Sequence, residues 1–365
     1  MLGREKRDAA LLMEKLRFGI CGLGFMGRTH FARLRVHPQA EVVAVCDQDA
    51  RRRGGDWSDA VGNLNVGQAD GGRSSLAGIA AYATVEELIA DPRVDAVLVA
   101  LPTPLHAGVT VAALAAGKHV LCEKPMAGRV ADCDRMVRAA QASGRTLMVA
   151  QCIRFWPQYE TIKRCVDEGR VGAVRFMTLR RLGSPPTYSA GNWLMNGGQS
   201  GGALLDLHVH DVDFAQFALG IPDTISARGT RGSSGAFDHV VATWAYSDGR
   251  YVLIEGGWML AAPWSFEMEV VIHGDRGTLA WALSRGSDVL LHSGGERAVP
   301  IPAAGDAYQQ ELDYFITCVR AGAPVARCLP WSSRASVALA WLERRSIERG
   351  RIVPISTRLR AAWSA

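Results

Sequence analysis

Residues 15–49 read KLRFGICGLGFMGRTHFARLRVHPQAEVVAVCDQD and contain two apolar runs that flank a glycine-rich turn and a helical stretch. The first run, RFGIC, leads directly into GLGFMG, and the second run, EVVAVC, ends at an aspartate. The helix between them is expected to continue through about His37 and to end at Pro38. A GxGxxG turn between a strand and a helix is typical of a dinucleotide-binding unit. The stretch therefore predicts a strand–helix–strand unit of a parallel sheet.

The glycines of this turn have separate physical roles. Gly22 allows a tight turn, Gly24 lets the backbone approach a pyrophosphate, and Gly27 lets the helix pack on the strand. The free N–H groups at the helix start would bind the phosphates, so we place Phe25 and Met26 in the cofactor site as well. The alternative is a glycine-rich turn without a ligand.

Asp47 follows Gly27 by 47 − 27 = 20 residues, at the end of the second predicted strand. A carboxylate at this position accepts hydrogen bonds from the ribose hydroxyls of NAD and repels the 2′-phosphate of NADP. Gln48 and Asp49 come next and bring no positive charge, so the sequence favours NAD over NADP. The basic run Arg51–Arg53 is the one feature nearby that could reverse this preference.

Strand-like and helix-like stretches continue to alternate up to residue 150. Helices are expected over 85–90, 107–117 and 129–144, and strands over 95–100, 119–123 and 146–152. Such alternation predicts a doubly wound parallel sheet, an α/β Rossmann domain that binds NAD, over residues 16–150. Ligands of these sheets lie beyond the carboxyl ends of the strands. We therefore predict cofactor contacts from the loop residues Pro102, Thr103 and His106 and from Glu123 and Lys124.

Two segments lie outside this pattern. Residues 54–78 are rich in glycine and serine and lack helical periodicity, so we interpret them as a surface insertion. Residues 1–15 form an N-terminal extension whose apolar run, AALL, is too short for a signal peptide.

From about residue 172, short alternating strands separated by the turn signals SDG, GDRG and GG predict a mostly antiparallel, open sheet. Two amphipathic helices follow, and RIVPI near residue 353 is expected to return as a strand. We predict an α+β domain over 151–355 for the substrate and for oligomerisation, with the final helix or strand able to return to the first domain. The open sheet face predicts a homodimer or homotetramer.

Composition excludes several classes of protein. The chain of 365 residues has 48% hydrophobic and 21% charged residues and a scattered net charge of 41 − 36 = +5, which disfavours nucleic-acid binding. No apolar run approaches the length of a membrane span. Eight cysteines without a CxxC pair indicate buried thiols in a reducing compartment, and we expect the cytoplasm.

The stretch SGGALLDLHVHDVDFAQFALG, residues 200–220, gathers carboxylates and imidazoles: Asp206, His208, His210, Asp211 and Asp213. A metal site is one interpretation, although the two histidines would face apart on a helix, and we predict no metal. The acidic first turn of a surface helix is a second. A third places Asp206 and His210 on one helical face, where the carboxylate orients an imidazole base.

Lys124 lies between a glutamate and a proline in LCEKPMAG, directly after a predicted buried strand. A surface turn accounts for such a tripeptide on its own. Its place at the carboxyl edge of the sheet, on the cofactor side, also permits a catalytic role.

Several motifs together resemble the Gfo/Idh/MocA family, named for glucose–fructose oxidoreductase, inositol dehydrogenase and rhizopine catabolism. They are GLGFMG, LPTPLH, CEKPMA, RFWPQYETIKRCVDEGRVG, GGALLDLHVHDVD and ELDYFITCVRAG, and the resemblance covers nearly all of residues 16–355. It implies a Rossmann domain followed by an α+β domain with an open antiparallel sheet. It also implies that Lys124 is catalytic, that Asp206 and His210 are its partners, and that the Lys124–Pro125 peptide is cis.

The resemblance implies an NAD(H)-dependent oxidoreductase that moves a hydride between nicotinamide and a secondary hydroxyl of a sugar, sugar derivative or cyclitol. Lys124, Asp206 and His210 would contact the substrate, and Gln151, Arg154, Trp193 and Trp258 are further candidates for its pocket. For these four residues, core packing or a surface ion pair is the competing interpretation.

Two other functions are open. The family also includes enzymes whose bound NAD cycles internally during glycoside cleavage, and these would accumulate no NADH. A non-catalytic NAD-binding regulator would have lost the lysine or the histidine, whereas this chain keeps Lys124 and His210.

Overall fold

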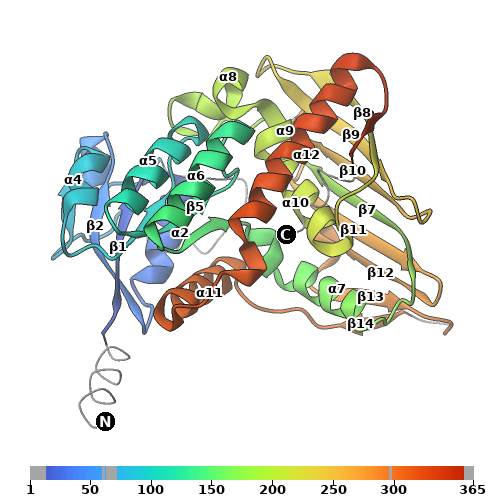
Figure 1. Cartoon of the computed structure of the whole chain (residues 1–365), viewed down its shortest axis with the longest axis horizontal. Helices are drawn as coiled ribbons and strands as arrows, with labels where there is room; N and C mark the ends of the chain where they lie inside the picture. The colour runs from blue at the N-terminus through green and yellow to red at the C-terminus, as the bar shows by residue number, and fades with distance from the viewer. Residues whose placement is uncertain (1–13, 60–61, 63–71, 296–297, 357–365) are drawn as a thin grey trace, which may run out of the picture.

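The computed structural model describes residues 14–59, 62, 72–295 and 298–356 and contains two large sheets side by side (Figure 1). The first is a six-stranded, wholly parallel sheet in the order β3-β2-β1-β4-β5-β6. Its strands are β1 (Leu16–Cys21), β2 (Ala40–Cys46), β3 (Ala80–Tyr82), β4 (Ala96–Val99), β5 (His119–Glu123) and β6 (Leu147–Ala150). The predicted doubly wound parallel sheet is confirmed.

The helices that connect these strands are α2 (Phe25–Leu34), α3 (Ala50–Arg53), α4 (Val85–Ala90), α5 (Thr103–Ala115) and α6 (Val130–Ser143). Helix α4 has the predicted bounds, because Thr84 and Glu87 form a capping box at its start. Helix α2 ends at Leu34, earlier than the predicted His37. Strands β4 and β6 are buried at every position, as expected for a parallel sheet with helices on both faces.

The second sheet has nine strands in the order β14-β13-β12-β11-β7-β10-β9-β8-β15. These are β7 (Val174–Leu182), β8 (Thr224–Arg231), β9 (Phe237–Ala245), β10 (Tyr251–Gly257), β11 (Glu267–Gly274), β12 (Gly277–Ala282), β13 (Val289–His292), β14 (Val299–Ile301) and β15 (Val353–Pro354). Only β7 and β10 pair in parallel, so the predicted mostly antiparallel sheet is confirmed. The strand predicted at RIVPI is β15, at the edge beside β8.

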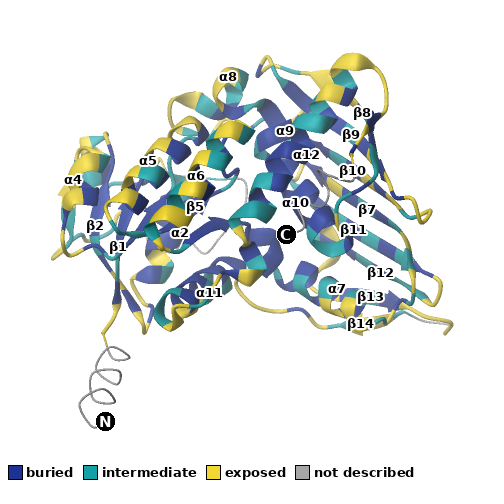
Figure 2. Ribbon diagram, viewed as in Figure 1, coloured by how far each residue is buried: buried dark blue, intermediate teal, exposed yellow. Residues whose placement is uncertain are grey.

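One face of the second sheet is covered by helices, among them α7 (Pro157–Asp167), α10 (Val209–Leu219) and α12 (Pro330–Arg349). Strand β11 shows the resulting alternation, because Met268, Val270 and Ile272 are fully buried and the residues between them are half-buried. Figure 2 shows buried residues concentrated on α9 (Gly202–Asp206) and α10, between the sheet and α12. The other face of the sheet remains partly exposed, as the sequence predicted.

A C-terminal helix returns to the first sheet. Helix α11 (Ala307–Ala321) packs against α2, and the ring of Phe315 lies 6.0 Å from that of Phe18 in β1. Helix α12 contacts α6 and also packs on β8 of the second sheet. The boundary between domains 16–150 and 151–355 therefore stays a prediction, since α11 shares the core of the first sheet.

The predicted insertion is partly described. Its residue Trp57 is fully buried and packs edge-on against Phe31 of α2, with ring centroids 4.7 Å apart. Residues 60–61 and 63–71 of the insertion, and residues 1–13 of the N-terminal extension, lie outside the described residues. Within the described chain, no helix is both long enough and apolar enough to cross a membrane.

Replacing Phe315 with alanine is expected to lower the free energy of unfolding by about 3–5 kcal/mol, because a fully buried ring between α11 and β1 is lost. Chemical denaturation followed by circular dichroism measures the change. The control Val36→Ala, at an 80% exposed position, should stay within about 0.5 kcal/mol of wild type. Similar losses for the two variants would show that α11 is not anchored in this core.

Candidate active site

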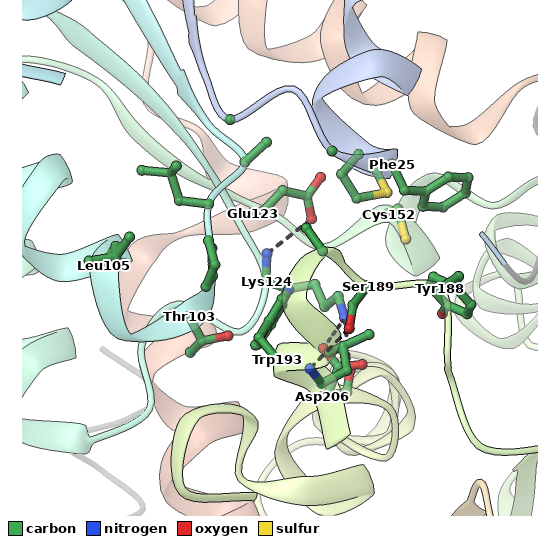
Figure 3. A pocket seen from close by; sticks show the side chains of 18 of the residues that line it. Phe25, Thr103, Leu105, Glu123, Lys124, Cys152, Tyr188, Ser189, Trp193 and Asp206 are labelled. Atoms are coloured by element: carbon green, nitrogen blue, oxygen red, sulfur yellow. Dashed lines mark hydrogen bonds and ion pairs between the residues drawn. The ribbon is translucent and has the colours of Figure 1, made fainter. Parts of the chain in front are cut away.

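A cavity of about 470 Å³ lies beyond the carboxyl ends of the first sheet and is also lined by residues from the second half of the chain. Residues before position 150 line it with Gly22, Gly24, Phe25, Met26, Asp47, Pro102, Thr103, Glu123 and Lys124. Later residues line it with Trp156, Arg181, Tyr188, Trp193, Asp206, His210, Phe266 and Met268, among others. Figure 3 shows part of this wall, with Lys124 between Glu123 and Asp206. The structure thus brings most of the predicted cofactor and catalytic residues to one cavity.

The glycine-rich turn opens into the cavity at Gly24. A Cβ atom at Gly22, where φ is +93°, would lie 2.3 Å from the carbonyl oxygen of Ala100, and one at Gly27 would lie 1.8 Å from that of Gly22. A Cβ at Gly24 would meet nothing closer than Arg52 Nη1 at 4.0 Å. The tight packing at two glycines and the open space at the third fit a backbone that receives a pyrophosphate at the start of α2.

Asp47 is fixed by two backbone donors at the end of β2. Its Oδ2 accepts a hydrogen bond from Leu23 N and its Oδ1 accepts one from Asp49 N, both at 2.9 Å. Arg52 also lines the cavity, with its Nη2 atom 2.7 Å from Asp59 Oδ2. The carboxylate is therefore held where a ribose would bind. Two guanidinium groups lie nearby: that of Arg52 pairs with Asp59, and that of Arg53 donates to the backbone oxygens of Asp47 and Gln48.

Lys124 follows β5 and reaches across the cavity (Figure 3). Its Nζ atom donates to the backbone oxygen of Asp206 at 2.8 Å and lies 3.2 Å from Asp206 Oδ1. The Lys124–Pro125 peptide is cis, as the family resemblance implied. Glu123 supports the same turn, because its Oε2 accepts from Lys124 N at 3.2 Å and its Oε1 lies 2.7 Å from His30 Nε2.

Asp206 and His210 do not share one continuous helix, which corrects the prediction of a stacked pair. Helix α9 ends at Asp206 and α10 begins at Val209. At the junction His208 N donates to Ala203 O at 2.8 Å, five residues back, so the turn is wider than in an α-helix and later side chains are rotated. No hydrogen bond in the described structure joins Asp206 to His210. The carboxylate contacts Lys124 instead.

The imidazole of His210 lines the cavity but is otherwise buried. Burial lowers the pKa of His210 well below its usual value, and the positive charges of Lys124 and Arg181 lower it further. Its Nδ1 atom has no hydrogen-bond partner among the described residues. His210 is therefore a neutral imidazole near pH 7, next to the ammonium group of Lys124.

His208 belongs to the core and not to the cavity. Its Nε2 atom lies 2.8 Å from Glu343 Oε2, and the other oxygen of Glu343 accepts from Trp244 Nε1 at 2.8 Å. All three side chains are fully buried. In the part of the chain that the structure describes, no three His, Cys, Asp or Glu side chains are placed to hold a metal ion.

Of the four candidates for the substrate pocket, only Trp193 lines the cavity. Gln151 and Trp258 are buried outside it. Arg154 is buried in an ion pair with Asp213, with Nε–Oδ2 and Nη2–Oδ1 distances of 2.7 Å. Arg154 therefore forms an ion pair and does not line the substrate pocket, and the pair lies in the core and not on the surface.

Two residues that were predicted to contact the cofactor lie behind the cavity wall and do not line the cavity. Gly27 lies beneath the glycine-rich turn, and His106 is buried between two carbonyl oxygens. The nitrogens of His106 lie 2.9 Å from Pro125 O and 2.7 Å from Leu101 O. His106 thus ties the loop after β4 to the turn that carries Lys124.

Four residues that were not predicted from the sequence also line the cavity: Arg181, Tyr188, Phe266 and Met268. A signal for Arg181 exists in the sequence, because neighbouring residues of a strand face opposite sides and one arginine of the pair in TLRRL must point inward. The other three residues carry no local signal, since their roles depend on how β11 and the loop after β7 approach the first sheet.

Glu311 of α11 is a fully buried carboxyl group, and its two oxygens have no hydrogen-bond partner among the described residues. Burial raises the pKa of Glu311 well above its usual value, and the charge of Glu123 raises it further. Glu311 is thus protonated in the folded protein near neutral pH, close to the turn that carries Lys124.

A dinucleotide-binding turn and a lysine–histidine cluster in one cavity define a nucleotide-dependent oxidoreductase. Two family models match the chain: the oxidoreductase family with an NAD-binding Rossmann fold over residues 16–151, and the GFO/IDH/MocA C-terminal domain over residues 159–280. The chain belongs to the GFO/IDH/MocA oxidoreductase family and is a nicotinamide-dependent dehydrogenase.

Known proteins resemble the chain over most of its length. Inositol 2-dehydrogenase of Rhizobium meliloti is 26% identical over 364 residues, which cover 93% of this chain and 99% of the relative. Trans-1,2-dihydrobenzene-1,2-diol dehydrogenase of Macaca fascicularis is 32% identical over 237 residues, 63% of this chain and 65% of the relative. The crystal structure of a probable dehydrogenase from Thermotoga maritima superposes with a TM-score of 0.75 at 26% identity, covering 93% and 98% of the two chains.

Replacing Glu311 with glutamine should change how stability depends on pH. Because the folded pKa of Glu311 is raised, the unfolded chain loses this proton first, and the contribution of Glu311 to wild-type stability falls as pH rises above about 4.5. Glutamine cannot lose a proton. The free energy of unfolding of the variant should therefore rise relative to that of wild type, by up to ~1.4 kcal/mol per pH unit from about pH 5 upward. Denaturation midpoints from pH 5 to 8 measure the difference.

The control is Glu168→Gln at an exposed position after α7, which should follow wild type at every pH. A stability difference between Glu311→Gln and wild type that stays constant from pH 5 to 8 would show that Glu311 is ionised in the folded protein.

Proposed function

We propose that the protein oxidises a secondary hydroxyl of a sugar, sugar derivative or cyclitol and passes the hydride to NAD. The observation that carries this proposal is the convergence of Lys124 Nζ and the neutral imidazole of His210 on the cavity into which Gly24 opens. The relative that is named inositol 2-dehydrogenase supports the choice of a cyclic polyol.

Lys124 and His210 would have different roles in the oxidation of the alcohol. Lys124, held by Asp206, donates a hydrogen bond to the substrate oxygen and stabilises negative charge that develops there. His210 accepts the hydroxyl proton, for which its imidazole must be neutral, and its lowered pKa keeps it neutral near pH 7. Bound NAD supplies the hydride acceptor. Asp206 thus positions Lys124, not His210.

The cofactor preference rests on Asp47. Its carboxylate lines the cavity and is held by Leu23 N and Asp49 N, so it cannot easily turn away from a 2′-phosphate. The guanidinium of Arg52 is occupied by Asp59. We therefore propose NAD as the cofactor in preference to NADP.

The outer face of the second sheet supports a homodimer or homotetramer. It carries Tyr251 and Leu253, which are 44% and 37% exposed, and a stacked pair of rings, Phe176 and Tyr251, with centroids 5.5 Å apart. A second copy of the chain would cover this apolar surface. The eight cysteines are all buried and none forms a disulfide, which supports a reducing compartment such as the cytoplasm.

Purified protein is expected to form NADH, measured by absorbance, with one class in a panel of inositols, hexoses, pentoses and glycosides. Lys124→Ala should lower kcat/KM by about 10²–10⁴-fold, because a group that stabilises the transition state is removed. NADH binding, measured by fluorescence, should change little. The control Lys163→Ala removes a lysine of α7 that pairs with Asp167 outside the cavity, and it should keep full activity. Tight NADH binding without turnover of any alcohol would contradict the proposal and favour internal cycling of NAD or a regulatory role.

With the best substrate, kcat/KM for NAD should exceed that for NADP by at least about tenfold, since a charge–charge repulsion of ~1–4 kcal/mol acts on the 2′-phosphate. Asp47→Ser should narrow this ratio. Asp49→Ser, which changes the cap of α3 and leaves Asp47 in place, should not. Equal use of the two cofactors by the wild type would contradict the preference assigned to Asp47.

A further inference from the structure

The inward arginine of β7 occupies an unusual position in the cavity wall. Arg180 points to the outer face of the sheet and pairs with Glu255 and Glu269, whereas Arg181 points inward and is only 2% exposed. A fully buried guanidinium is costly unless its charge and its donors are matched. Each N–H donor of Arg181 therefore needs an acceptor.

The donors of Arg181 are satisfied on one side only. Nε and Nη2 each donate to an oxygen of Asp211 at 2.9 Å, and Nη2 also donates to the hydroxyl of Tyr159 at 3.2 Å. Among the described residues, the hydrogen-bond partner of Nη1 is the sulfur of Met268, at 2.6 Å. A guanidinium has five N–H donors and sulfur is a weak acceptor. Among the described residues no oxygen accepts from Nη1, which leaves a buried donor group without a full partner.

Nη1 contacts Met268, which is itself a residue of the cavity wall. Arg181 and Met268 both line the cavity that also contains Lys124, Asp206 and His210. Arg181 also lies close enough to His210 for its positive charge to lower the pKa of that imidazole. An oxygen of a molecule held by Lys124 and His210 would therefore be within the region that Nη1 can reach.

The charges around this region are paired. Asp211 matches Arg181, Asp206 matches Lys124, and His210 is neutral near pH 7. A carboxylate on the substrate would add an unmatched negative charge to a buried wall. A neutral hydroxyl needs only the donor that Nη1 offers.

We propose that Nη1 of Arg181 binds a second hydroxyl of the substrate, on the carbon next to the one that is oxidised, so that the site selects neutral vicinal diols. This inference rests on the proposed dehydrogenase function and names its substrate class. Much of the nearby wall is aromatic or apolar, with Trp193, Phe266 and Met268, so Arg181 is the main discriminating contact for that hydroxyl. Asp211 is a positioning residue that holds the guanidinium.

The test compares two substrates across variants of the full chain with NAD. The substrates are the polyol that forms NADH fastest and its deoxy analogue that lacks the neighbouring hydroxyl. The wild type should prefer the polyol by about 10–100-fold in kcat/KM, because the analogue leaves a buried donor unpaired. In Arg181→Met/Asp211→Asn, which removes both charges together, the preference should fall to within about threefold. Arg181→Lys should lie between, and the matched control Arg180→Lys should keep the wild-type preference.

Thermal unfolding and NADH binding separate a folding defect from a change in specificity. An equal loss with both substrates in the Arg181 variants would overturn the proposal, because a merely structural arginine affects both alike. Faster turnover of a sugar acid than of its neutral counterpart would also overturn it. If no polyol is oxidised by the wild type, the proposed function itself fails. Turnover that is insensitive to the neighbouring hydroxyl contradicts only the role of Arg181.

Discussion

Lys124 extends from the end of β5 and donates to the backbone oxygen of Asp206, with Asp206 Oδ1 at 3.2 Å from the same nitrogen. This contact joins the last residues of a strand in the first sheet to the helices that cover the second. The glycine-rich turn belongs to the first sheet and His210 to a helix that covers the second, and both line the cavity that this contact crosses. The cis peptide at Pro125 and the carboxylate of Glu123 shape the turn from which Lys124 extends.

Around this contact the protein keeps buried charge balanced. Arg154 and Asp213, and Arg181 and Asp211, form paired charges in the layer between the second sheet and α12. His210 and Glu311 have no such partner, and burial shifts the pKa of each toward the neutral form. Of these two groups only His210 lines the cavity, beside the paired charges of Lys124 with Asp206 and Arg181 with Asp211.

The sequence was sufficient where a function depends on neighbouring residues. GLGFMG, Asp47 and Lys124 each follow a buried strand, and their place at the edge of a parallel sheet follows from that fact alone. It was insufficient where tertiary packing decides. The wide turn at His208 separates Asp206 from His210, and Arg154 finds its partner Asp213 from another element. Neither the wide turn nor the ion pair produces a periodic pattern in the sequence. The return of α11 to the first sheet was open in the sequence for the same reason.

The most direct test of a single site built from both sheets is a crystal structure of the protein with NADH bound. We predict that the adenosine ribose contacts Asp47, that the pyrophosphate lies against Gly24, and that the nicotinamide lies beside Lys124 and His210. NADH bound in the opposite direction, or with its nicotinamide away from Lys124, would show that the two sheets do not build one active site.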